Sequence, residues 1–192
     1  MPHMHHHAYW NNNGGLIIPI GPGVTPIRYT SEFLVITYYF NSGRDLDTRT
    51  KLADPDLGDY LGWARASDVG NGLLVWGGDN TGTGLESVAV DIYKFKTLYP
   101  NKNTITLNFR CFWYGTVGTT PVQLNLTLYK GGQLTRAGFG FTNTTAADSK
   151  QVTSFSKTIS LFTRTASNNG QGLATMVYNV YSGTGYLNTN YG

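Results

Sequence analysis

The chain has 192 residues, of which only 13% are charged, with 24 glycines, 13 tyrosines and a formal net charge of +3. This length predicts one domain with a peripheral segment, and the aromatic content excludes a disordered chain. The Lys and Arg residues are scattered rather than clustered, so we expect no nucleic acid as a partner.

Residues 1–30 differ in composition from the rest of the chain. They contain the His-rich run HMHHH (residues 3–7) and four prolines. Each Pro removes a backbone donor and restricts the residue before it, so we predict an extended N-terminal arm over 1–30 and one β-domain over 31–192. No apolar stretch approaches 18 residues and no signal-peptide order is present, which predicts folding in the cytoplasm and no membrane contact.

From residue 33 onward, apolar residues recur with a period of two. The pattern is clearest at 104–113, where Ile105, Leu107 and Phe109 alternate with polar residues and Cys111 falls on the apolar side. We expect Cys111 to be a small buried side chain. Further strands are predicted at 33–40, 73–76, 122–129, 152–162 and 173–181, and one helical turn at 92–100. Gly- and Asn-rich turns between them predict an all-β chain folded as an antiparallel β-sandwich.

Acidic residues are few, so their grouping is informative. Asp45 and Asp47 are two residues apart, which on a strand places both carboxylates on the same face. Two like charges this close need a basic side chain or a cation between them. Arg44 and Arg49 are one solution, and a hard cation is the other.

A second group of oxygen ligands follows about 30 residues later. Asp79, Asn80 and Glu86 belong to a loop in which Gly82 and Gly84 let the backbone turn its carbonyls inward. Calcium takes six to eight such oxygens, whereas zinc prefers Cys or His, which neither segment contains. DLDTR lacks the fifth and sixth residues of an EF-hand loop, and DNTG is also an ordinary hairpin turn.

Together the two segments resemble the tellurium-resistance TerD-like domain, whose signature runs roughly D-L-D…S-G-D-N-x-T-G-x-G…E-x-[IV]-x-V-D-L. The matching residues here are DLD (45–47), GGDNTGTG (77–84), LES (85–87) and VAVDI (88–92), followed by LYPNKNTITLNF (98–109). The resemblance covers about residues 33–130 and implies a β-sandwich that binds calcium through these loops.

The resemblance implies a specific set of ligands. It carries over Asp45, Asp47, Asp79 and Glu86 as carboxylate ligands, Asn80 through an oxygen atom, and Gly82 through its main-chain carbonyl. The family's acidic run before the Glu is replaced by Leu85 alone. We therefore expect one calcium ion rather than the pair that the family can bind.

Catalytic motifs are lacking. No G-x-S-x-G, HExxH or CxxC sequence occurs, and all four histidines lie within residues 3–7, so we expect no enzyme activity. Those histidines could chelate a transition metal or form a solvated tract. The aromatic residues Trp63, Trp76, Trp113 and Tyr114 could form a sugar-stacking platform, although at strand spacing they are typical of core packing.

The low-charge, Asn-, Thr- and Tyr-rich composition and the Pro-rich arm predict an assembly component. We expect a virion structural protein of a bacteriophage, in capsid decoration or in the tail, whose arm contacts copies of itself or other virion proteins. Two alternatives are a soluble cytoplasmic calcium-binding module of the tellurium- or stress-resistance type, and a carbohydrate-binding domain.

Overall fold

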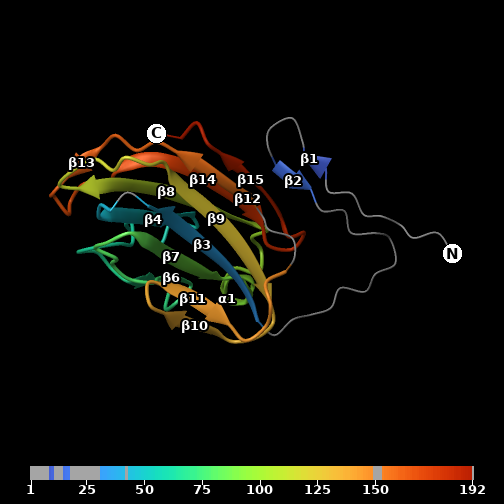
Figure 1. The fold of residues 1–192 in the computed structure, drawn as a ribbon. Coiled ribbons are helices and arrows are strands. Elements are labelled where there is room, and N and C mark those ends of the chain that lie inside the picture. The colour runs from blue at the N-terminus through green and yellow to red at the C-terminus, as the bar shows by residue number, and fades with distance from the viewer. Residues whose placement is uncertain (1–8, 11–14, 18–30, 42, 149–152, 192) are drawn as a thin grey trace.

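The computed structural model describes residues 9–10, 15–17, 31–41, 43–148 and 153–191. The described chain is mostly β-strand, with one short helix, and its strands form two large sheets and one two-stranded sheet (Figure 1). The all-β prediction is therefore confirmed. Most of the predicted arm lies outside the described residues.

The larger sheet has seven strands in the order β1-β2-β15-β14-β8-β13, and β4 also pairs with β8. Its members are β1 (Tyr9–Trp10), β2 (Gly15–Ile17), β4 (Leu46–Asp54), β8 (Thr104–Tyr114), β13 (Phe162–Thr163), β14 (Gln171–Asn179) and β15 (Thr184–Asn188). All of these pairs are antiparallel except β13 with β8.

The second sheet has six strands in the order β12-β9-β3-β7-β6-β5, all antiparallel. Its members are β3 (Glu32–Phe40), β5 (Asp68–Val69), β6 (Leu74–Trp76), β7 (Gly84–Asp91), β9 (Val122–Lys130) and β12 (Thr153–Lys157). A separate hairpin is formed by β10 (Leu134–Ala137) and β11 (Gly140–Asn143). This hairpin lies against β7, and the backbone amide of Ser87 donates a hydrogen bond to the Phe139 carbonyl at 2.9 Å.

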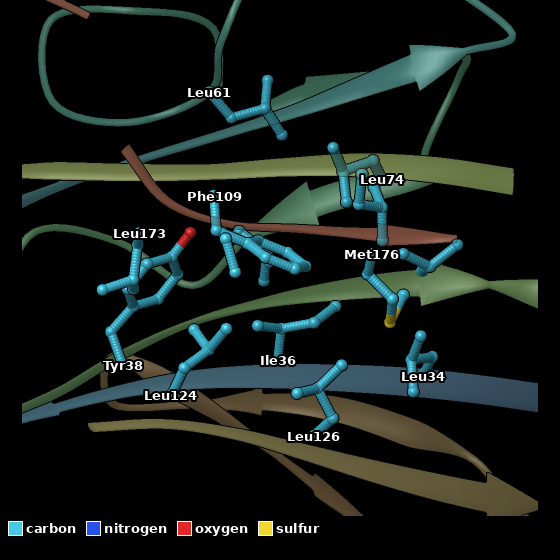
Figure 2. Close-up of a cluster of buried hydrophobic side chains, with 14 of the residues drawn as sticks. Leu34, Ile36, Tyr38, Leu61, Leu74, Phe109, Leu124, Leu126, Leu173 and Met176 are labelled. Atoms are coloured by element: carbon cyan, nitrogen blue, oxygen red, sulfur yellow. The ribbon is translucent and has the colours of Figure 1, made fainter. Parts of the chain in front are cut away.

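Inward side chains of both sheets meet in one hydrophobic core. Ile36 of β3 and Leu126 of β9 lie opposite Phe109 of β8 and Met176 of β14, and all four are essentially inaccessible to solvent (Figure 2). The Tyr38 ring meets the Phe109 ring edge-on across the two sheets, with centroids 6.3 Å apart. Alternation along β8 and β9 fills this core, as the period of two predicts.

The predicted helical turn is the helix α1 (Ile92–Leu98). Asp91 caps its N-terminus by accepting a hydrogen bond from the Lys94 amide at 2.8 Å, and Pro100 follows soon after its end. Ile92 and Phe95 turn their side chains into the protein interior. Among the described residues no helix has the length and apolar character needed to span a membrane.

Candidate metal centre

The two segments predicted to supply ligands are neighbours in the fold although they belong to different sheets. Asp45 directly precedes β4 in the seven-stranded sheet, and Asp79 lies in the loop between β6 and β7 in the six-stranded sheet. The Gly43 amide donates to the Thr83 hydroxyl at 2.8 Å and links the two loops. The Asp45 carbonyl is held by the Tyr114 amide of β8 at 2.9 Å.

The loop of residues 77–84 owes its shape to two glycines. Gly78 and Gly84 have φ of +119° and +146°, which side-chain-bearing residues rarely adopt. A Cβ atom on Gly84 would also lie 2.9 Å from the side-chain nitrogen Nδ2 of Asn80. Gly84 therefore has the conformational role that the sequence predicts, whereas Gly82 is not among the glycines with positive φ.

Glu86 is fully buried at the start of β7, and three donors from different segments converge on it. Its Oε2 accepts a hydrogen bond from the Thr48 hydroxyl at 2.5 Å and another from Trp76 Nε1 at 3.3 Å. Its Oε1 accepts a hydrogen bond from the backbone amide of Asn80 at 2.9 Å. Asn80 in turn accepts from the Gly82 amide through Oδ1, at 3.1 Å. Glu86 therefore joins β4, β6 and the 77–84 loop.

Three aspartate oxygens near this network have no donor. They are Asp45 Oδ1, Asp47 Oδ2 and Asp79 Oδ1, each buried and without a hydrogen-bond partner. The Asp47 side chain is the most enclosed, since the residue is only 3% exposed. A buried carboxylate oxygen without a donor is costly, and a cation, a bound proton or an ordered water molecule would each relieve that cost.

The acidic groups perturb one another. Burial first, and then the charge of Asp79, raises the pKa of Asp45 to about 6. Burial raises the pKa of Asp47 to about 7; Arg49 opposes this shift, while Asp45 and Asp79 add to it. Burial also raises the pKa of Asp79, and it raises that of Glu86 to about 8. These mutual effects place the four carboxyl groups in one electrostatic cluster.

Arg49 is a positive charge that lowers the pKa of both Asp47 and Asp79, but its hydrogen bonds go elsewhere. Its guanidinium is fully buried over the Phe112 ring, 5.0 Å from the centroid, and donates to the carbonyls of Thr48, Ala166 and Asn168. Among the described residues, none of the ion pairs involves Asp45, Asp47 or Asp79. Arg49 thus moderates the cluster without satisfying its oxygens.

The side chains as they stand do not form a closed coordination shell. Within the described residues, no group of three or more His, Cys, Asp or Glu side chains is placed so that it could hold a metal ion. The donor chemistry of this cluster fits a hard cation, because its three donor-free atoms are carboxylate oxygens.

The six predicted ligands therefore differ in their surroundings. Asp45, Asp47 and Asp79 present donor-free oxygens, whereas Glu86 has its oxygens engaged and Asn80 directs Oδ1 to the loop. Sequence reasoning missed the donors Thr48 and Trp76. Thr48 follows the DLD segment directly, and that position was the available signal.

The other residues singled out in the sequence have packing positions or lie outside the described residues. Cys111 is fully buried, as expected. Trp113 and Trp76 are core residues, which removes both from any sugar-stacking platform. Trp63 and the partly exposed Tyr114 meet edge-on at an interplanar angle of 68°, which is not a flat surface for a sugar ring. The histidines lie outside the described residues.

No family model matches this chain, and no curated protein or solved structure matches it either. The likeness to the TerD-like domain therefore remains an expectation from the sequence.

Proposed function

We propose that this protein is a non-enzymatic β-sandwich that one calcium ion stabilises, and that it serves as a structural component of a bacteriophage particle. The observation that carries the calcium proposal is the group of three buried, donor-free oxygens on Asp45, Asp47 and Asp79. Their segments come from the two sheets that together supply the core.

Calcium would satisfy these oxygens without requiring a regular geometry. Asp45, Asp47 and Asp79 would hold the ion, and main-chain carbonyls of the 77–84 loop, with Gly82 among them, would complete the shell. Glu86 would position the residues around the ion, since it accepts hydrogen bonds from the backbone amide of Asn80 and the hydroxyl of Thr48. The ion supplies positive charge here and no reaction.

Calcium binding is tested by thermal unfolding in excess calcium and in chelator. An ion that binds only the folded state at a hundredfold excess over its dissociation constant stabilises by about 2.7 kcal/mol. We expect the wild type to show a higher Tm in calcium, and the double variant Asp45→Ala/Asp79→Ala to lose that difference. Asp56→Ala is the matched control, because Asp56 is an exposed carboxylate paired with Lys51 at 3.1 Å. A wild-type Tm that is equal in calcium and chelator overturns the calcium proposal.

The particle role is supported by the described surface. Large apolar or aromatic side chains are about half exposed at several separate places: Tyr93, Leu98, Phe162, Tyr181 and Tyr186. Such side chains are enriched where protein surfaces bind one another, and charged residues are depleted there, as they are in this chain. These features favour a packed assembly over an isolated calcium module.

The particle role has a direct experiment. Particles purified from a lysate of infected host cells would be analysed by mass spectrometry, and we expect this chain in stoichiometric amount with the other particle proteins. Its presence only in the soluble fraction of the lysate overturns the role and favours the free calcium-binding module.

A further inference from the structure

We infer that the edge of β15 that faces away from β14 accepts a strand from a second copy of this chain, and that residues 15–17 of that copy are the segment that occupies it. The inference rests on the proposed function, because it needs copies held side by side in an assembly. It deepens that function by naming the surface and the segment through which copies are joined.

The first observation is a strand pairing already present. β2 pairs antiparallel with β15, with Leu16 opposite Gly185 and Gly15 opposite Tyr186. β1 continues the sheet on the far side of β2, so the short strands β1 and β2 lie beyond β15 (Figure 1). The edge of β15 is thus shaped to receive an extended segment through main-chain hydrogen bonds.

The second observation is that β15 belongs to the domain independently of β2. Its other side is paired with β14 along its whole length, from Thr184 to Asn188. Leu187 packs against the core, whose described members run from Leu34 to Val180. Without β2, β15 would present an unpaired edge, which proteins normally cover.

The third observation concerns the chain between β2 and the domain. Thirteen residues separate Ile17 from Ser31. A chain of that length spans up to about 45 Å when extended. That reach exceeds the radius of gyration of about 16 Å expected for a domain of this size. The same register can therefore be made within one chain or between two.

The choice between these two pairings depends on concentration. The hydrogen bonds are identical in both cases, as in domain swapping. Linkage within one chain corresponds to a local concentration in the millimolar range, so dilute protein keeps β2 on its own β15. Copies fixed next to each other in a particle provide a comparable or higher local concentration, so β2 then divides between its own β15 and that of the neighbour.

The experiment uses two full-length single-site variants, Gly15→Cys and Tyr186→Cys, which face each other in the register. Opposed residues of an antiparallel pair lie within the Cα separation that a disulfide allows. Tyr186 is 47% exposed, so its replacement leaves the core intact, and the native Cys111 is fully buried. Equal amounts are mixed, unfolded, refolded together at about 1 mM, the range of the local concentration, then oxidised and run on a non-reducing gel.

We expect a disulfide-linked heterodimer from this mixture. The control pairs Gly15→Cys with Tyr181→Cys, because Tyr181 is 51% exposed but lies outside the β2 register. A heterodimer yield at least fivefold above this control supports the inference. A yield equal to the control overturns it, whether or not the double variant Gly15→Cys/Tyr186→Cys closes within one chain. Failure of the calcium proposal shows in the Tm comparison and failure of the particle role in the mass spectrometry, and neither measurement depends on this gel.

Discussion

Replacing Asp47 by Asn has opposite expected effects with and without calcium. The pKa of Asp47 is raised from 3.8 to about 7, and a shift of that size corresponds to about 4 kcal/mol between the two protonation states. Above pH 8 the ionised side chain therefore destabilises the fold in chelator. Asn removes the charge but keeps a buried polar group, so we expect a net gain of about 1–2 kcal/mol, or a Tm higher by about 2–8 °C.

In excess calcium the same substitution removes one of the carboxylates that would hold the ion. The wild type then gains stability from binding, by about 2.7 kcal/mol at a hundredfold excess over the dissociation constant, and Asp47→Asn gains much less. The assay is thermal unfolding at pH 8.5 of both proteins in both conditions. Asp56→Asn is the matched control, since its carboxylate is exposed. A variant that is less stable than the wild type in chelator would refute the electrostatic reasoning.

Three further predictions follow from the same cluster. In chelator the folded state binds more protons than the unfolded state, because burial raises the pKa of Asp45 to about 6 and that of Glu86 to about 8; the free energy of unfolding should therefore fall as pH rises from about 4 to about 8, measured by urea titration. Glu86→Ala leaves the donors of Thr48, Trp76 and Asn80 without their acceptor and should cost at least about 3 kcal/mol in chelator, whereas Glu86→Gln keeps an acceptor and should cost less. Gly84→Ala should lower Tm by several degrees through strain at φ +146°, while Gly82→Ala, whose Cβ would lie 3.6 Å from its nearest neighbour, should be milder; equal losses would contradict this reasoning.

The period of two predicted much of the sheet structure. The strands at 33–40, 104–113 and 122–129 correspond to β3, β8 and β9 within one or two residues. β9 and most of β8 alternate between buried and more exposed residues, whereas β3 is a continuous apolar run. β4 was harder to recognise. Residues 46–50 are all buried, because the loop around Gly62 covers the face of β4 that points away from the core. Polar and charged residues of β4 are therefore buried as well, and the sequence does not alternate between apolar and polar residues.

The candidate site was predictable in position but not in its division of roles. The resemblance to the TerD-like domain implied which segments would meet, and the structure places them next to each other. The sequence could not indicate that Glu86 would accept hydrogen bonds from Thr48 Oγ1, Trp76 Nε1 and the backbone amide of Asn80. Those donors come from three separate segments, and only tertiary packing brings them to one carboxylate.

The position of the acidic cluster leads to a last prediction, about which part of the fold a cation would stabilise. Asp45 and Asp47 belong to the start of β4, whereas Asp79 precedes β7 in the other sheet. One ion bound to all three would join the two sheets at this end, next to the hydrogen bond between Thr48 and Glu86 that already does so. Calcium should therefore slow amide hydrogen exchange most at residues 43–48 and 77–86.

The opposite end of the same sheets provides the internal control for that measurement. Helix α1 and the first residues of β8 lie away from the acidic cluster, and their exchange should respond only through the change in global stability. Equal slowing of exchange at both ends would mean that calcium binds somewhere other than between Asp45, Asp47 and Asp79. Selective slowing at the cluster that disappears in Asp47→Asn would tie the ion to the three oxygens that have no donor, and it would do so without reference to any particle or partner.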